Sequence, residues 1–283
     1  AINRALAIGV SGGGKAAVSV SALGNGVANT VTAQVKNSTV TAGGDLGVTA
    51  RDVAPSVLPS WMLSSDKQAQ LDSALADSPI ALDANILAIM VSVAGSGKVG
   101  VSVALMGNVV TNTVKATVSG STVRAGVDAL GNITNANSDL VVTSESGAGI
   151  IAISVGVGAG GNVGVQATGF GNVITNRTEA SVTGGSNVNV GGLVDVTATD
   201  RSHISCIGLS IAASGSAAIS VIVGANVITD SVVAEISGST VRGGSTLNIE
   251  AETGSMIYAL AAGVAAASSV GVQVTLAGNV ITN

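Results

Sequence analysis

The chain has 283 residues, a net charge of −5 and a mean hydropathy of +0.62, yet it contains only one Phe, one Tyr and one Trp. Its 11 Lys and Arg residues are scattered, so we expect no nucleic-acid partner and no binding to an anionic membrane surface. The single cysteine excludes an internal disulfide. With so few aromatic rings and 39 glycines, the interior is expected to be filled by Val, Ile, Leu and Ala, and the turns to be glycine turns.

One stretch, residues 107–118 (G-N-V-V-T-N-T-V-K-A-T-V), recurs in edited form along the whole chain. The first Asn of each copy falls at Asn25, Asn108, Asn172, Asn226 and Asn279, with gaps of 83, 64, 54 and 53 residues. The last two gaps define a repeat of about 53 residues, and the first two contain insertions. Repetition at a fixed period is typical of solenoids and arrays. We therefore predict an all-β, parallel β-solenoid over residues 1–283, cut from a longer array because both ends fall within a repeat.

Before each marker lies an apolar stretch that alternates large and small residues, as in residues 152–157 (A-I-S-V-G-V). Strict alternation predicts a strand with two different faces. We expect the large aliphatic face to line a packed interior. The small face, represented by Ala152, Ser154 and Gly156, is uncharged and is expected to lie close against another surface. It is a candidate face for self-association into fibres.

A second strand follows a turn rich in Gly, Ser and Ala, and there Val18 and Val20 flank Ser19 in the pattern of an ordinary half-exposed strand. After the marker, further alternating residues lead into Ser-Thr-Val or Ser-Asn-Val and then a short strand, for example residues 247–251. The 53-residue unit divides into about 27 and 26 residues, which are plausible lengths for two stacked coils. Hairpin-built repeats are the competing topology.

Two columns of Asn residues follow from the repeat. The first contains the marker residues themselves. The second lies four residues on, at Asn29, Asn112, Asn176, Asp230 and Asn283. Stacked amides can form hydrogen-bonded ladders along a β-stack, so we interpret both columns as structural. Ligand-binding amides are the alternative.

Insertions fall at residues 54–83 and 127–138. The first holds all three prolines and the only tryptophan, and Ser65-Asp66-Lys67-Gln68 has the spacing of a capping box, so a short amphipathic helix is expected over about 66–76. The second reads as a polar loop. Insertions in arrays map to surface loops, often on the binding face. The apolar residues of the first insertion either contact a partner or only dock the insertion on the solenoid: Trp61, Leu63, Leu71 and Leu75.

No residue pattern indicates catalysis or a bound cofactor or metal. His203 and Cys206 lie three apart in an expected strand, and therefore on opposite faces. Glu250 and Glu252 share a face, but no acidic cluster continues along the repeat, which disfavours a glycan-cleaving enzyme. The most apolar stretch, residues 149–165, is interrupted by glycines and alternates, so a membrane span is not expected.

With G-N-V-I-T-N, G-S-T-V and the Gly/Ala/Ser-rich return strands in view, the chain resembles the repetitive passenger regions of large secreted bacterial exoproteins, the filamentous-haemagglutinin-like and leukotoxin-like adhesins. The resemblance covers nearly the whole chain outside residues 54–83. It implies an extracellular or cell-surface location and a stalk or fibre without catalytic residues. It also implies that the chain contacts its flanking repeats, other copies side by side or end to end, or a host receptor. A β-helical glycan-active enzyme and a membrane-active toxin segment are the alternatives.

Overall fold

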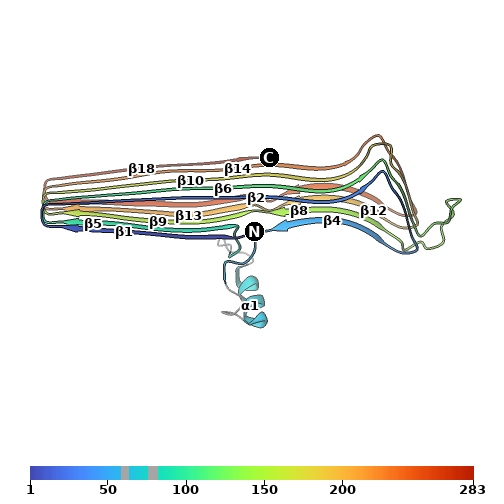
Figure 1. Ribbon diagram of the computed structural model, residues 1–283, viewed down its shortest axis with the longest axis horizontal. Coiled ribbons are helices and arrows are strands. Elements are labelled where there is room, and N and C mark those ends of the chain that lie inside the picture. The colour runs from blue at the N-terminus through green and yellow to red at the C-terminus, as the bar shows by residue number, and fades with distance from the viewer. Residues whose placement is uncertain (59–63, 76–81) are drawn as a thin grey trace.

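The computed structural model describes residues 1–58, 64–75 and 82–283. Its strands form four sheets of four or five strands each, and one short helix stands outside them. The predicted parallel β-solenoid with a short helical insertion is thus confirmed (Figure 1).

Each of the first four repeats contributes one strand to each of the four sheets. The fifth repeat contributes strands only to sheets A and B. Sheet A contains β1 (Asn3–Gly13), β5 (Ile86–Ser96), β9 (Gly149–Gly160), β13 (His203–Ser214) and β17 (Met256–Ala267). Sheet B contains β2 (Ala16–Lys36), β6 (Val99–Ser119), β10 (Val163–Thr183), β14 (Ala217–Ile236) and β18 (Val270–Thr282). Sheet C contains β3 (Thr39–Ala42), β7 (Thr122–Ala125), β11 (Asn187–Val190) and β15 (Thr240–Gly243). Sheet D contains β4 (Leu46–Val53), β8 (Leu140–Gly147), β12 (Val194–Asp200) and β16 (Leu247–Thr253). The helix α1 spans Ser65–Leu75.

The register shows that each repeat forms one wide coil. Asn172 pairs with Asn226, and Asn226 pairs with Asn279, so equivalent residues of successive repeats are direct neighbours. The prediction of two coils per repeat is therefore wrong, because half a repeat never stacks on the other half. All ladders between named strands are parallel, which also excludes hairpin-built repeats in the described part of the chain.

Each coil is a flattened loop (Figure 1). Sheet B forms one long side, sheets A and D follow each other along the opposite side, and sheet C closes one end. We call sheet A together with the half of sheet B that precedes the first Asn column the blade. Sheets C and D, with the remaining half of sheet B, are called the body.

The corner between sheets B and C repeats in every coil and explains one glycine column. Gly120, Gly184 and Gly238 have φ angles of 59°, 69° and 55°, and Asn37 takes the equivalent place with a φ of 49°. Only Gly, and less readily Asn, adopts this left-handed conformation at low cost. The corner therefore needs these two residue types, as the repeat supplies them.

The body has ordinary solenoid polarity. Val118, Val182 and Val196 are fully buried and belong to one aliphatic cluster that crosses between sheets B, C and D. Charged residues lie on its outside, where Lys115 and Arg177 both pair with Glu179 at 3.2 and 3.0 Å. Those two cations offset the effect of partial burial on Glu179 and bring its pKa below the usual value. Burial of Val and Ile columns therefore stabilises this half of each coil.

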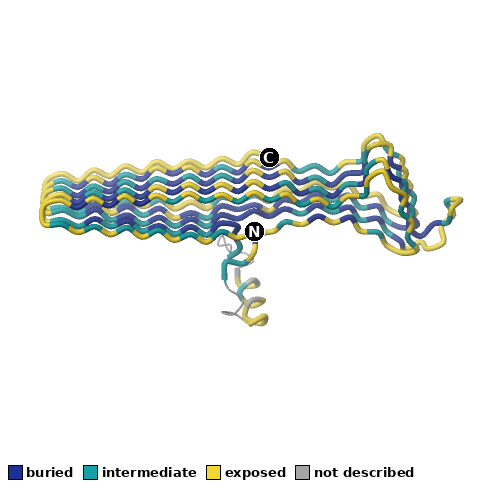
Figure 2. The backbone as a smooth tube through the Cα atoms, in the orientation of Figure 1, coloured by how far each residue is buried: buried dark blue, intermediate teal, exposed yellow. Residues whose placement is uncertain are grey.

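The blade has the opposite polarity, so the prediction that the large residues of sheet A face inward is wrong. Ala152, Ser154 and Gly156 are buried, whereas Ile153, Val155 and Val157 on the opposite face of the strand are only partly buried. Buried and more exposed residues alternate along the blade strands (Figure 2). The reason is the spacing of the two sheets. A Cβ atom on Gly158 would lie 2.0 Å from the carbonyl oxygen of Val165 on sheet B. Only small side chains fit between backbones that approach this closely.

The blade half of sheet B is also inverted relative to expectation. Ser19, Ser102 and Gln166 are buried, whereas Val18 and Val20 are 62% and 66% exposed at the end coil. The buried hydroxyls find partners across the two sheets: Ser102 Oγ donates to the carbonyl oxygen of Ser92 at 3.0 Å. Small and polar residues therefore line the interior of the blade towards its tip, and aliphatic residues cover its outside. Nearer the body, the interior also buries large residues such as Met90, Phe170 and Ile222.

The first insertion is pinned at its base by Val57 N–H donating to Leu82 O at 2.8 Å and by Ala84 N–H donating to Pro55 O at 3.0 Å. The expected helix is present as α1, which stands away from the sheets (Figure 1). Leu71 is half-buried on it, and Leu75 is its last residue. Trp61 and Leu63 lie outside the described residues.

The second insertion forms a loop around Asp128. Its Oδ1 accepts the backbone N–H groups of Leu130 and Asn132 at 2.9 and 2.8 Å, and its Oδ2 accepts the side-chain amide of Asn132. The side-chain bond from Asn132 is the main cause that lowers the pKa of Asp128. The loop projects from the sheet C end of the coil (Figure 1).

Candidate functional site

The outer face of sheet A is a flat array of aliphatic side chains. In β13, which has neighbours on both sides, Ile207 and Ile211 are still 39% and 40% exposed. Equivalent positions in the other four strands repeat the pattern. The array contains Leu6, Ile8, Val10, Ile89, Val91, Val93, Ile153, Val155, Val157, Ile207, Leu209, Ile211, Leu260 and Val264. We call it the sheet A face.

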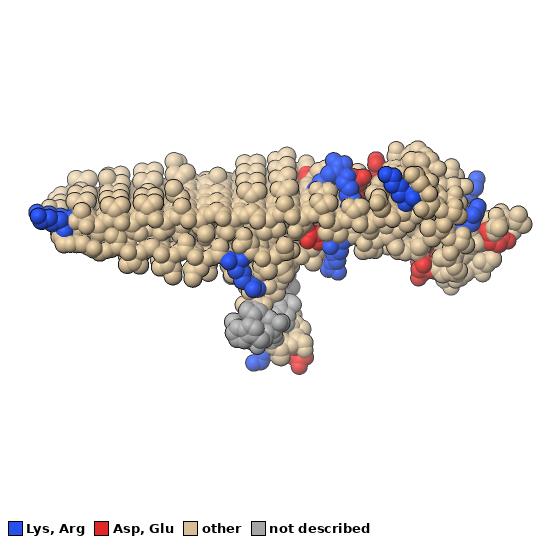
Figure 3. Space-filling model, in the orientation of Figure 1, with Lys and Arg blue, Asp and Glu red and all other residues tan. Residues whose placement is uncertain are grey.

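A second aliphatic array covers the outside of the blade half of sheet B. Leu105 and Val223, both on internal strands, are 49% and 50% exposed. Most charged side chains lie on the body, and a further group lies at the tip of the blade (Figure 3). Lys15 and Lys98 lie in the tip turns that join sheets A and B. Arg4, near the start of β1, is the one Lys, Arg, Asp or Glu within the blade strands, so both outer faces are otherwise free of charge.

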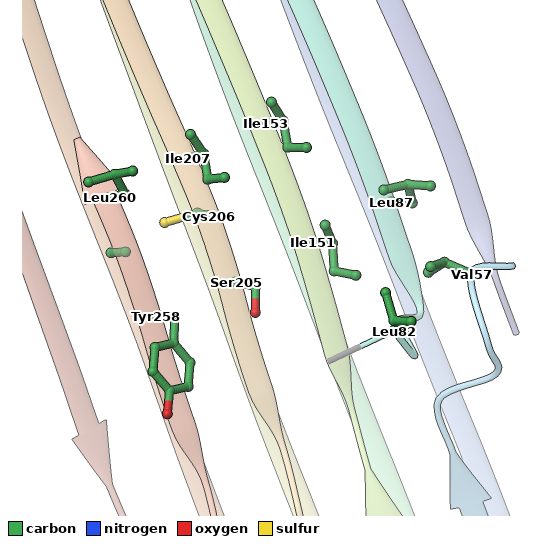
Figure 4. A pocket seen from close by; sticks show the side chains of 11 residues that line it. Val57, Leu82, Leu87, Ile151, Ile153, Ser205, Cys206, Ile207, Tyr258 and Leu260 are labelled. Atoms are coloured by element: carbon green, nitrogen blue, oxygen red, sulfur yellow. The ribbon is translucent and has the colours of Figure 1, made fainter. Parts of the chain in front are cut away.

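A groove of about 430 Å³ marks one end of the sheet A face. Val57 and Leu82 from the base of the first insertion overhang it, and Ile151, Ile207 and Tyr258 form its floor (Figure 4). The insertion therefore forms a raised apolar edge at the end of the array nearest the body. Val57 and Leu82, at the two ends of the insertion, therefore continue the apolar surface of sheet A.

The size of the sheet A face compares with that of a stable interface. Five strands of 11 or 12 residues cover roughly 24 by 36 Å at ordinary strand spacing and rise, or roughly 900 Å². A typical protein–protein interface buries about 800 Å² per partner, and contiguous apolar patches above a few hundred Å² are rare on monomers. The face is large enough to dock a partner.

Several residues of sheet A and sheet B are matched across the interior of the blade. Ser210 faces Ser220, with the hydroxyl oxygens 2.8 Å apart, and Ser92 faces Ser102 at 3.0 Å. Where sheet A has Gly156, sheet B has Gln166, and a Cβ on that glycine would lie 1.7 Å from the Gln amide nitrogen. Phe170 similarly fits against Gly208 and Gly224. This matching holds the two sheets close and presents the outer arrays on a rigid support.

The first Asn column forms a continuous amide ladder at the border between blade and body, as predicted. Each Nδ2 donates to the Oδ1 of the next Asn along the stack, at 2.8, 2.7, 2.7 and 2.8 Å, through Asn25, Asn108, Asn172, Asn226 and Asn279. The three inner members are at most 1% exposed. These amides satisfy one another, which supports the structural interpretation of this column over ligand binding.

The second column is in register but does not form a ladder. Asn29 and Asn176 instead donate to carboxylates, those of Asp52 and Asp200, at 3.0 Å each. Asn112 is 1% exposed, and neither of its amide atoms has a hydrogen-bond partner. The repeat predicted the positions of these residues, and the partners from sheet D decide what each amide does.

His203 and Cys206 have different surroundings. Cys206 faces inward and contacts Asn226, and burial raises the pKa of its thiol. His203 Nε2 lies 2.8 Å from the carbonyl oxygen of Asp83, where the first insertion returns to the solenoid. The ring of His203 thus serves to anchor the insertion.

Exposed carboxylates of sheet D are engaged in ion pairs between coils. Glu252 pairs with Arg201 at 3.4 Å, and Glu145 with Arg51 at 3.1 Å, whereas Glu250 is exposed on the same face. Among the described residues, no group of three or more His, Cys, Asp or Glu side chains is arranged to hold a metal ion. The helical part of the described chain includes no segment of the length and apolarity that crossing a bilayer would take.

Comparison with protein-family models, with curated proteins and with solved structures finds no match to this chain.

Proposed function

We propose that this chain is a non-catalytic structural segment of an extracellular bacterial β-solenoid protein, and that it associates side by side with other copies through the aliphatic faces of the blade. The single observation that carries the proposal is the sheet A face, with Ile207 and Ile211 near 40% exposed in an internal strand. A second copy suits this face because both surfaces are flat and repeat at the same strand spacing, so rows of one can fit between rows of the other.

An adhesive role is the second part of this proposal. It rests on the resemblance to secreted bacterial exoproteins and on the position of the two insertions, which project where a receptor could reach them. Insertions of this kind place contact residues on the surface of a repetitive support. In this proposal the coils provide the support, and α1 and the loop around Asp128 provide specificity.

The experiment is a measurement of assembly state by light scattering and electron microscopy for the full chain and two variants. Ile207→Lys with Ile211→Lys places two charges in the middle of the sheet A face, and we expect dissociation of lateral assemblies with an unchanged circular dichroism spectrum. Thr175→Lys, on the exposed outside of the body half of sheet B, is the matched control. A wild-type chain that stays monomeric at high concentration, or an Ile207/Ile211 variant that assembles normally, would remove the proposal.

One observation favours a membrane-active segment as a second candidate. The outside of the blade is apolar, serine hydroxyls are buried inside it towards the tip, and the strand from Ala16 to the Asn ladder spans roughly 30 Å, close to the thickness of a bilayer's hydrocarbon core. Leakage of dye-loaded liposomes separates the two candidates. Leakage caused by the wild type and abolished by Ile207→Lys with Ile211→Lys would favour the membrane, and intact liposomes would favour lateral association.

A further inference from the structure

Two carboxylates are buried next to each other where the second Asn column meets sheet D. The column has Asn in every repeat except one, where Asp230 pairs in register with Asn176. Asp230 is 4% exposed, and Asp200 at the end of β12 is fully buried. In the described chain, no Lys or Arg forms an ion pair with either one. Two adjacent negative charges inside a protein need compensation.

The surrounding groups are all neutral and rich in oxygen. Asp200 accepts hydrogen bonds from Ser202 at 2.7 Å and from the Asn176 amide at 3.0 Å, and Asp230 accepts one from Ser255. Two buried oxygens at this place have no partner, Oδ1 of Asp230 and Oδ1 of Asn176. Asn176 is 3% exposed, and its amide nitrogen donates to Asp200 and to Ser202, at 3.0 and 2.6 Å, which holds the side chain at the pair. A half-turn of the amide group exchanges its nitrogen and oxygen, and so directs Oδ1 towards a cation bound there. An unpartnered buried oxygen on each of two neighbouring coils points to a missing ligand.

We propose that the Asp200–Asp230 pair holds one calcium ion between two adjacent coils. The other oxygen ligands are the amide of Asn176 and the hydroxyls of Ser202 and Ser255. Carboxylate, amide and hydroxyl oxygens without nitrogen or sulfur form the ligand set that calcium prefers, and a divalent ion neutralises both carboxylates. One coil earlier, the residues equivalent to Asp200 and Asp230 are Ser146 and Asn176, which carry no charge, so the site is particular to this pair of coils.

The test compares calcium with EDTA in thermal unfolding and titration calorimetry of the full chain at pH 8. We expect one calcium per chain and a rise in Tm of about 5–10 °C at saturating calcium. Asp230→Asn, which restores the residue that the other repeats carry, should fold and lose both the binding and the shift. Asp200→Ser, the residue of the preceding coil, should do the same. Asp195→Asn, on the same strand but hydrogen-bonded to Thr197 and Asn248, is the matched control and should respond as the wild type.

Two results would overturn the proposal. The first is a wild-type chain that neither binds calcium nor shifts in Tm at pH 8; a gain in stability from Asp230→Asn in that case would show that the pair holds only a proton. The second is a full calcium response in Asp230→Asn, which would place the ion elsewhere.

Discussion

The blade and the body are built from the same coils, yet they solve the packing problem in opposite ways. In the body, large aliphatic residues such as Val118 and Val182 are buried and charged residues face outward. In the blade, the small residues Ala152 and Gly156 are inside and residues such as Ile207 are outside. The difference is the distance between the sheets: the body needs large side chains, whereas the blade admits a large side chain such as Phe170 only where a small residue such as Gly208 faces it. Alternation alone therefore does not tell which face of a strand is buried.

The strongest way to break the comparison is to thicken the blade. Gly158→Val adds a side chain where a Cβ would lie 2.0 Å from a backbone oxygen that cannot move aside, so we expect a loss of about 3 kcal/mol or more. Thermal or urea unfolding followed by circular dichroism measures it. Gly171→Val is the control, because a Cβ at Gly171 meets no atom within 4 Å. Equal effects at the two positions would contradict the close approach of the sheets.

The next effect concerns the ladder at the border of the two halves. Asn172→Ala leaves the Asn108 amide and the Asn226 carbonyl without partners in a buried place, and we expect a cost of about 2–4 kcal/mol. Asn112→Ala removes an equally buried amide that has no hydrogen-bond partner, and it should cost less. Urea unfolding of both variants measures the difference. If Asn112→Ala proves the more costly, the ladder is not what stabilises this border.

A matched pair of valines tests the polarity of the two halves directly. Val182→Ala, in the body, removes a fully buried side chain and should cost about 2 kcal/mol. Val223→Ala, on the outside of the blade, removes one that is 50% exposed and should stay within about 0.5 kcal/mol in the monomer. Chemical unfolding at low protein concentration makes the measurement. A larger loss at Val223 would mean that the outer arrays are covered within one chain.

The most gradual effect is expected from pH, because a single group at the border titrates over about three pH units. The pKa of Asp230 is raised to about 7 in the folded chain, so between its unfolded pKa of 3.8 and that value the folded state binds the extra proton. The free energy of unfolding should therefore fall as the pH rises from about 4 to 7. Urea unfolding in EDTA across this range tests it, and Asp230→Asn should flatten the slope. A slope of the opposite sign in the wild type would contradict the burial of an uncompensated carboxylate.

Much of the architecture was predictable because the repeat itself carries it. The Asn columns, the strand positions and both insertions follow from aligning the chain with itself, and the helix near residue 66 follows from the capping-box spacing of Ser65 to Gln68. The width of the coil did not follow, since half a repeat is also a plausible coil length. A signal for the inverted blade was present but needed pairing of positions ten apart: Ser210 with Ser220, and Gly156 with Gln166. Two positions that hold glycine and a large residue in one repeat, and two serines in another, are positions that face each other across a thin interior.

The proposed calcium site was hidden for a different reason. Asp230 was visible as the one acidic member of its column, but Asp200 lies 30 residues earlier on another sheet, and only the fold brings the two together. The candidate self-association residues Ala152, Ser154 and Gly156 show the converse. Their small size correctly predicts that another surface lies close against them, but that surface is the other sheet of their own coil.

The width of the coil also decides what a longer array of this kind would gain from each added repeat. A repeat of 53 residues advances the stack by only about 4.8 Å, so adding coils is a costly way to project a tip far from a surface. The same repeat enlarges both outer faces of the blade by a strip that is one strand wide and tens of ångströms long. Growth by duplication would thus yield a broad ribbon with ever more lateral area and little extra reach, which suits cohesion within a mat or sheath better than probing at a distance.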